Sequence, residues 1–340
     1  MKIQKVAEDL GVRYVLEGSV QKSSDRVRIT AQLIDAMTGR HVWSEHYDRK
    51  PQDIFALQDE ITLKIAQSMR VELTEGEQAR HWAKKAGTDN LKALETNYQG
   101  IDFMRRMTKQ DNDTARQLFQ EAVALDPKFV GAYVNLGWTH FWDARLGWSE
   151  SPAKSLQRAF QLGQKAVAME EAIDVGHSLL ASIYLVMRQH DKAIAEGERA
   201  VALNPNGATA YVALAGIAGC AGKWEESISY SKQAIRLSPF SECVDYWILG
   251  RSYFMTGQHD EAILTLKKAV QINPDFLPAH IFLAACYSSL GRDAEAAAAT
   301  KEVLRINPKF SVESYAKTLP YKNIADIERE VAALRKAGLK

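Results

Sequence analysis

From about residue 91 onward, apolar and small residues recur at spacings of three and four, the period of one face of an α-helix. This pattern is itself repeated along the chain. The prolines Pro205, Pro239, Pro274 and Pro308 are spaced 34, 35 and 34 residues apart, and Pro127 lies 78 residues before the first of them. A period of this length predicts an array of helix pairs, in which each pair buries its apolar face against its neighbours.

The repeat that ends at Pro274 shows what each position contributes. Leu249 and Gly250 are followed three residues later by Tyr253, which places an apolar, a small and a ring residue on one helix face. The small residue lets the second helix approach closely. The polar turn between the two helices carries an acidic residue, here Asp260, which we expect to cap the second helix.

These positions recur in phase in the last four repeats, and the pattern resembles the tetratricopeptide repeat. The resemblance implies a mainly α protein with a right-handed α-solenoid of about six helix pairs over residues 91–310. The second repeat carries an insertion near residues 143–158, and residues 311–340 are expected to form C-terminal capping helices. Proteins of this kind hold a protein or peptide partner.

The first 50 residues follow a different pattern. Three segments, 13–20, 27–34 and 41–47, are rich in β-branched and aromatic residues, and the second alternates apolar and polar residues with period two. They predict a three-stranded antiparallel meander, preceded by a short helix at residues 3–10. Residues 51–90 are expected to form a helix and linker that lead into the array.

The string GVRYVLEGSVQKSSDRVRITAQLIDAMTGRHVWSEHYDR, followed by DIFALQDEI, resembles the TolB-like amino-terminal domain. In bacteria that domain recurs between a class III adenylate/guanylate cyclase domain and a tetratricopeptide array, and it also occurs behind winged-helix transcription regulators. The closing segment, residues 319–339, is similar to the tail of the cyclase-linked arrays.

The resemblance is incomplete at the start of the chain. The family's domain begins with a strand, a helix and a second strand that have no counterpart here, so we expect a partial α/β domain over residues 1–50. We infer a truncated or late-started reading frame, or a split gene. The alternative is a divergent small domain that closes its own sheet edge.

Composition narrows the class of protein. A net charge of +1 offers no field for holding nucleic acid, so we expect no nucleic-acid partner. The three cysteines have no CxxC spacing and are typical of reduced interior residues in a cytosolic protein. No secretory signal opens the chain, and the longest weakly polar run, residues 211–222, is too short to cross a bilayer. These features predict a cytoplasmic protein that binds no membrane.

We find no catalytic constellation in the sequence. Gly222 and Lys223 suggest a phosphate loop only superficially, because Trp224 follows where Ser or Thr is needed. His177 and His280 occupy an interior position that Tyr fills in other repeats, which favours core packing over metal binding. A class III cyclase needs a catalytic domain with paired metal-binding aspartates, and no segment has that pattern. We predict no enzyme, no cofactor and no metal.

In a tetratricopeptide array the first helix of each pair lines the concave face. When the repeats are aligned, two aromatic clusters fall at positions of the first helices that face this concave groove. Aromatic and arginine side chains are the usual anchors of protein interfaces. The candidate groove residues are Asn97, Trp138, Phe141, Trp142, Ser178, Ser182, Trp247, Arg251, Phe254 and Ile281. We expect them to bind an apolar or helical segment of a partner. The alternative is that the rings pack on an inserted helix near Trp148 or on the neighbouring repeat.

The sequence therefore predicts a non-catalytic scaffold or regulatory module, comparable to the interaction half of a cyclase-linked signalling protein. An upstream cyclase or regulator domain is its candidate partner. The alternatives are the interaction half of a winged-helix transcription regulator, a fragment of an adenylate cyclase, and an enzyme with an unrecognised site. The cyclase-linked module and the winged-helix regulator are distinguished by whether the adjacent upstream gene encodes a cyclase or a winged helix.

Overall fold

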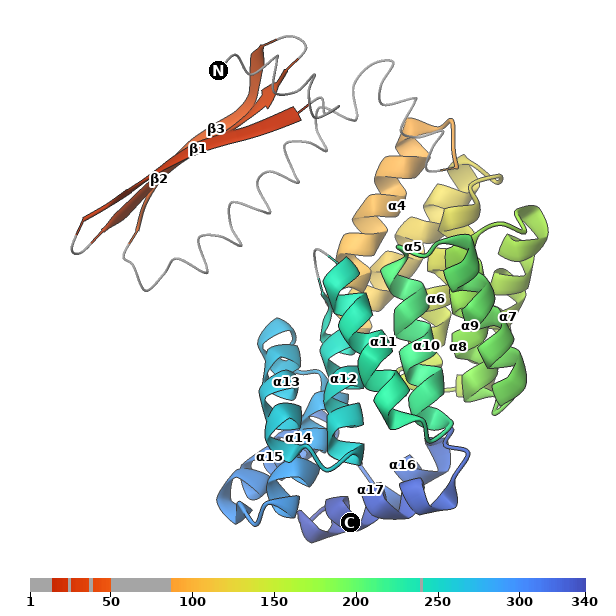
Figure 1. Ribbon diagram of the computed structural model, residues 1–340. Coiled ribbons are helices and arrows are strands. Elements are labelled where there is room, and N and C mark those ends of the chain that lie inside the picture. Colours follow the sequence, from red (N-terminus) through yellow and green to blue (C-terminus); the bar gives the residue numbers. More distant parts are fainter. Residues whose placement is uncertain (1–13, 24–25, 37–38, 50–86, 239–240) are drawn as a thin grey trace. The chain divides into compact units, whose positions relative to one another are not determined.

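A computed structural model describes residues 14–23, 26–36, 39–49, 87–238 and 241–340 (Figure 1). The chain divides into two compact units, residues 1–91 and 92–340, and each is described by itself. The helix expected at residues 3–10 lies outside the described residues. So does nearly all of the helix and linker expected over residues 51–90.

The first unit contains a three-stranded antiparallel sheet in the order β1-β2-β3. Its strands are β1 (Tyr14–Lys22), β2 (Val27–Asp35) and β3 (Arg40–Arg49). Gly18 on β1 pairs with Ala31 on β2, which in turn pairs with Glu45 on β3. Val27, Ala31 and Leu33 are buried, as the period-two pattern of β2 predicted. The predicted meander is confirmed.

Fourteen helices are described in residues 87–238 and 241–340. The first twelve form six consecutive pairs, and the helices of a pair pack against one another (Figure 1). In the first pair this contact is made by Gly100 and Phe119. The pairs are α4 (Leu91–Met104) with α5 (Lys109–Leu125), α6 (Val130–Arg145) with α7 (Pro152–Met169), α8 (Asp174–Val186) with α9 (His190–Leu203), α10 (Ala208–Cys220) with α11 (Trp224–Leu237), α12 (Cys243–Met255) with α13 (His259–Ile272), and α14 (Leu277–Ser289) with α15 (Asp293–Ile306). The predicted fold class is confirmed.

The small residues of the repeat allow the helices of a pair, and of successive pairs, to approach closely. A Cβ placed on Gly250 of α12 would lie 2.6 Å from Leu266 Cγ on α13. A Cβ on Gly137 of α6 would lie 2.5 Å from Leu179 Cδ2 on α8, in the next repeat. Both distances are too short for a carbon–carbon contact, so a side chain at either position would force the neighbouring leucine to move.

The expected capping by acidic residues in the inter-helix turns is wrong. The N-cap residues of α9, α11 and α13 are Gln189, Lys223 and Gln258, and none of these side chains makes a cap hydrogen bond. The acidic residues, among them Asp191 and Asp260, lie in the first turn. There they favour the helix through its dipole. The helices begin one or two residues earlier than the sequence pattern suggested.

The insertion in the second repeat lengthens existing helices. Helices α6 and α7 have 16 and 18 residues, whereas those of the four later pairs have 13 or 14. Residues 146–151 form a turn between them, in which Gly147 adopts φ 69°. The alternative that the rings pack on an inserted helix near Trp148 is therefore wrong, because the extra residues extend both helices of the pair.

The C-terminal segment, residues 311–340, contains α16 (Val312–Thr318) and α17 (Ile324–Lys336). Helix α17 packs against α14, and the segment also runs back across the turns of earlier repeats (Figure 1). The Lys322 amide donates to the Cys220 carbonyl at 2.7 Å, and the Arg329 guanidinium donates to the Met255 carbonyl at 2.7 Å. The segment therefore connects the fourth, fifth and sixth repeats.

The turn between α4 and α5 contacts a repeat far along the chain. Asn273, at the end of α13, donates from Nδ2 to the carbonyls of Arg106 and Met107 at 3.0 and 3.1 Å. Arg105 forms an ion pair with Glu242, at 3.2 Å, just before α12. The first and fifth repeats are thus in direct contact.

Candidate functional site

The inner side of the array holds a small cavity of about 90 Å³, which we call the central cavity. It lies where α6, α8, α10 and α12 face one another, and Pro320 of the C-terminal segment contributes to its wall. Six of the ten predicted groove residues line it: Trp138, Phe141, Trp142, Ser182, Trp247 and Arg251. These six residues come from three different repeats, and the sequence assigned them to one surface only because they occupy similar positions within their repeats.

The aromatic cluster predicted on α6 packs mainly on itself. The Trp138 and Phe141 rings meet edge to face with centroids 5.2 Å apart, and Phe141 meets Trp142 in the same way at 5.0 Å. Trp138 and Trp142 stack at 6.1 Å. Phe141 is buried, whereas Trp138 and Trp142 keep partly accessible faces. Such arrangements are favourable for aromatic rings and make a rigid apolar wall.

Arg251 on α12 is buried, with only 3% of its surface exposed. Its guanidinium carbon lies over three rings, at 5.1 Å from Trp247, 5.7 Å from Trp224 and 5.9 Å from Tyr321. Within residues 87–238 and 241–340, no carboxylate oxygen lies within 4 Å of this guanidinium. Its Nε is buried without a hydrogen-bond partner.

A buried carboxylate lies near this arginine, but other groups satisfy it. Glu330 of α17 is 0% exposed and accepts hydrogen bonds from the hydroxyls of Tyr315 at 2.6 Å and Tyr321 at 2.5 Å. Burial raises the pKa of the Glu330 carboxyl, and the hydrogen bonds from the two tyrosines and the charges of Arg251 and Arg145 offset this only in part.

A larger cavity of about 510 Å³, the lateral cavity, adjoins the same residues. Arg145 and Trp247 line both the central and the lateral cavity. The remaining walls are the turn after α6, the start of α14 and the chain between α15 and α16, and they include Leu146, Phe276 and Phe310. The Arg145 guanidinium lies 5.7 Å from the Trp247 ring centroid.

The other four predicted residues are placed differently. Ile281 lines the lateral cavity. Phe254 packs on Phe282 of the next repeat at 5.7 Å and borders a third cavity, of about 640 Å³, beside α17. Asn97 is buried and accepts a hydrogen bond from Asn135 at 3.0 Å. The Ser178 hydroxyl donates to the Asp174 carbonyl at 3.0 Å within its own helix.

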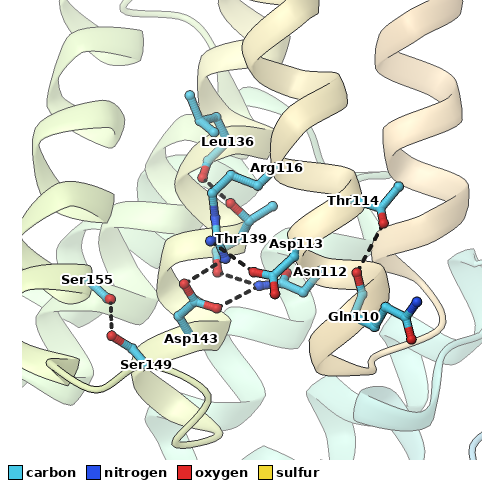
Figure 2. Close-up of polar contacts among 10 residues, drawn as sticks. All are labelled: Gln110, Asn112, Asp113, Thr114, Arg116, Leu136, Thr139, Asp143, Ser149 and Ser155. Carbon is cyan, nitrogen blue, oxygen red and sulfur yellow. Dashed lines mark hydrogen bonds and ion pairs between the residues drawn. The ribbon is translucent and has the colours of Figure 1, made fainter.

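A buried polar cluster fixes the end of α6 that carries Arg145 (Figure 2). Asn112 of α5 donates from Nδ2 to the Thr139 carbonyl at 3.0 Å and to the Asp143 carboxylate at 2.9 Å. Arg116 pairs with the other oxygen of Asp143 at 2.7 Å. Burial raises the pKa of Asp143, while Arg116 and Asn112 act in the opposite direction. The cluster positions the turn that lines the lateral cavity.

Sequence reasoning missed Arg145, Tyr315, Pro320 and Glu330. Arg145 lies three residues after Trp142, so helical spacing could have placed it on the same face. The other three belong to the C-terminal segment and reach the inner face only through its return path. No local pattern of the sequence carries that information.

His177, His280 and the three cysteines lie in the interior, as the sequence predicted. His177 lies 2.6 Å from Glu196 Oε2 and 2.9 Å from the Glu171 carbonyl, and His280 lies 2.8 Å from the Pro274 carbonyl. Cys220, Cys243 and Cys286 are free and buried. Among the described residues, no group of three potential metal ligands occurs, and no helix is long and apolar enough to span a bilayer.

Comparisons with known proteins agree with this architecture. Family models described as tetratricopeptide repeat match residues 178–242 and 253–319. The curated protein "Putative adenylate cyclase 3" of Rhizobium meliloti (strain 1021) is 36% identical over 192 residues, which is 56% of this chain and 32% of that protein. The chain thus spans about a third of the length of this relative.

Two solved structures are similar in fold. One is "Crystal structure of APC/C hetero-tetramer Cut9-Hcn1", with a TM-score of 0.51 and 17% identity over 72% of this chain and 43% of that chain. The other is "Crystal structure of PilW, widely conserved type IV pilus biogenesis factor", with a TM-score of 0.43 and 19% identity over 58% and 92%. The repeat matches and the stacked helix pairs show a tetratricopeptide-repeat solenoid, the architecture of protein-interaction modules.

Proposed function

We propose that this chain is a non-catalytic interaction module of a bacterial signalling system whose catalytic component is a nucleotide cyclase. One observation carries the proposal: six residues assigned to the groove by repeat phase converge on one apolar cavity of the inner face. Apolar walls with a few polar groups are typical of recognition sites.

The partner in this proposal is an apolar or helical protein segment that contacts the candidate groove residues. Trp138 and Trp142 are its proposed anchors, because their rings form a rigid stack and are only partly buried. Rigid aromatic side chains lose little entropy on binding and dominate interface energies.

The cyclase assignment draws on the relative named as an adenylate cyclase. The three-stranded meander supports the TolB-like reading of residues 1–50 as part of the same proposal. The proposed location is the cytoplasm, where nucleotide triphosphates are available and where free buried cysteines remain reduced.

The test is a pull-down with the tagged full chain as bait. The prey are a purified class III cyclase catalytic domain and, separately, a winged-helix DNA-binding domain from the same organism. The cyclase domain should be retained, and Trp138→Ala should weaken retention about tenfold or more, as for an interface anchor. Leu264→Ala, at a position that is 66% exposed on α13, is the matched control and should leave retention unchanged.

Two results would contradict the proposal. One is retention of the winged-helix domain instead of the cyclase domain. The other is formation of cyclic AMP or cyclic GMP by the purified chain alone from ATP or GTP with Mg²⁺. Circular dichroism of Trp138→Ala must show the wild-type helix content for the comparison to count.

A further inference from the structure

Two arginines face the inner cavities without a carboxylate partner. Arg251 is almost fully buried, Arg145 is half-buried, and both line the central cavity. Within residues 87–238 and 241–340, no carboxylate oxygen lies within 4 Å of either guanidinium. Trp247, which lines both cavities, has a buried indole N–H with no hydrogen-bond partner.

Such an arrangement lacks a directly paired negative charge, because the Glu330 carboxylate acts on the two arginines only at longer range. Buried charges in proteins are normally paired, because an uncompensated ion in an apolar environment is strongly unfavourable. The nearest buried carboxylate, Glu330, is held by two tyrosine hydroxyls. Stacking of Arg251 on three aromatic rings compensates part of its charge but leaves the buried Nε without an acceptor.

We propose that the two cavities together bind a small organic carboxylate with a flat apolar body. Its carboxylate occupies the central cavity between Arg145 and Arg251, and its body occupies the lateral cavity against Trp247 and Phe276. Guanidinium groups recognise carboxylates through paired, charge-assisted hydrogen bonds. The apolar rings that line both cavities select a hydrophobic body.

The interior of the two cavities has the dimensions of a small-molecule site, whereas the protein segment of the proposed function would contact the partly accessible faces of Trp138 and Trp142. The lateral cavity, at about 510 Å³, lies within the range of about 300–1,000 Å³ that is typical of small-ligand sites. The central cavity, at about 90 Å³, has room for a carboxylate group but not for a helix about 10 Å across. Pro320, Phe310 and Tyr315 of the chain after α15 form part of the cavity walls and narrow the space that a ligand can occupy.

The experiment is a calorimetric titration of the full chain with 2-naphthoate, with the neutral isostere 2-naphthamide as the matched ligand. Naphthoate should bind about tenfold more tightly or better, since a hydrogen bond to a charged group contributes more than a neutral one. No protein partner takes part, so the result is independent of the proposed interaction with a cyclase. In a ¹H–¹⁵N spectrum, the indole resonance that is missing from Trp247→Phe should move on addition of naphthoate.

Two variants separate recognition from folding. Arg251→Met keeps an unbranched side chain at the buried site and should abolish the preference for naphthoate over naphthamide, without lowering the unfolding temperature. Arg145→Gln, at the half-buried position, should reduce the preference with no effect on folding. Arg236→Gln is the control, because Arg236 is exposed and its guanidinium donates hydrogen bonds to Gln233 of its own helix.

Three outcomes would overturn the proposal. They are equal affinity for acid and amide, binding of neither compound, and a naphthoate preference that survives in both Arg145→Gln and Arg251→Met. Binding of an acidic peptide in place of naphthoate would likewise assign the arginines to a protein ligand.

Discussion

Glu330 shows how one residue can hold the C-terminal segment on the inner face. Its carboxylate accepts from two tyrosine hydroxyls of the same segment, and Tyr321 in turn lies edge-on to Trp224 of α11 with centroids 5.5 Å apart. A fully buried carboxylate is tolerated only when its oxygens have donors. The two tyrosines therefore matter for stability chiefly through their hydroxyl groups.

Tyr321→Phe should lower the free energy of unfolding by about 1–3 kcal/mol, because it leaves one oxygen of a buried carboxylate without a donor. Urea unfolding at pH 7 measures the change. Tyr211→Phe is the control, since the Tyr211 hydroxyl donates to the Pro205 carbonyl at an exposed site, at 3.3 Å. Equal stability of the two variants would contradict the role assigned to the Tyr321 hydroxyl.

Glu330 also predicts a pH dependence. Burial raises its pKa in the folded protein above the ordinary value of 4.5, so the unfolded chain releases this proton first as the pH rises. The contribution of Glu330 to stability is therefore complete below pH 4.5 and falls as the pH rises through the folded-state pKa. Glu330→Gln removes this loss.

Measured by urea unfolding between pH 4 and pH 8, the stability of Glu330→Gln relative to wild type should rise with pH. Each unit of pKa difference corresponds to about 1.4 kcal/mol. The relative measurement cancels the titration of other groups that the two proteins share. A constant difference across this range would show that the pKa of Glu330 is the same in both states.

At the residue scale, repeat phase predicted much of the candidate site. Trp138, Trp247 and Arg251 line one cavity because equivalent positions of stacked repeats face the same side. How deeply these cavity-lining side chains are buried could not be predicted in the same way. It depends on the return of residues 311–340 and on the contact between Asn273 and Met107, which are separated by 166 residues.

At the scale of the helix pair, glycine sets the distance between helices. Gly250→Ala should destabilise the protein by about 1–3 kcal/mol, because the new methyl would lie 2.6 Å from Leu266 Cγ. Thermal unfolding measures the loss. The matched control is Gly216→Ala, at a first-helix position where the nearest atom, Leu185 Cδ2, is 3.9 Å away.

Gly216→Ala should leave stability unchanged or raise it by about 0.5–1 kcal/mol, since alanine favours a helix more than glycine does. An equal loss of stability in both glycine variants would show that close approach at Gly250 is not the cause.

The elements themselves were largely predictable. Proline spacing located the ends of the second helices, as at Leu203 before Pro205 and Ile272 before Pro274, because proline and the residue before it disfavour helix continuation. Helix starts were less certain. The polar turns offer several candidate caps, and first-turn residues such as Asp191 resemble N-caps in sequence while acting through the helix dipole.

At the scale of the whole repeat unit, the array departs from a simple succession of neighbours. In an ideal solenoid each repeat contacts only its neighbours, so the free energy of unfolding is approximately a sum of terms for single repeats and for neighbouring interfaces. Here the turn after α4 contacts Asn273 and Glu242 of the fifth repeat, and α17 packs against α14. Such contacts between distant repeats do not follow from the sequence period.

Asn273→Ala tests this connection. Asn273 ends α13 and donates to the Arg106 and Met107 carbonyls, whereas the equivalent Asn204 at the end of α9 donates to Asp174 of its own repeat at 2.8 Å. Both asparagines also accept a local hydrogen bond from the amide two residues later. Asn273→Ala and Asn204→Ala therefore differ mainly in whether a distant contact is lost.

Hydrogen exchange followed by mass spectrometry can locate the effect of each change. Asn273→Ala should speed exchange in α4 and α5, because the buried Met107 carbonyl loses its donor at a cost of about 1–3 kcal/mol. Asn204→Ala should act only on the third and fourth repeats. If exchange in Asn273→Ala rises only around α13 and α14, the first repeat does not depend on the fifth. The contact between Asn273 and the turn after α4 then adds no stability to the first repeat, and displacing that turn would cost a partner segment little free energy.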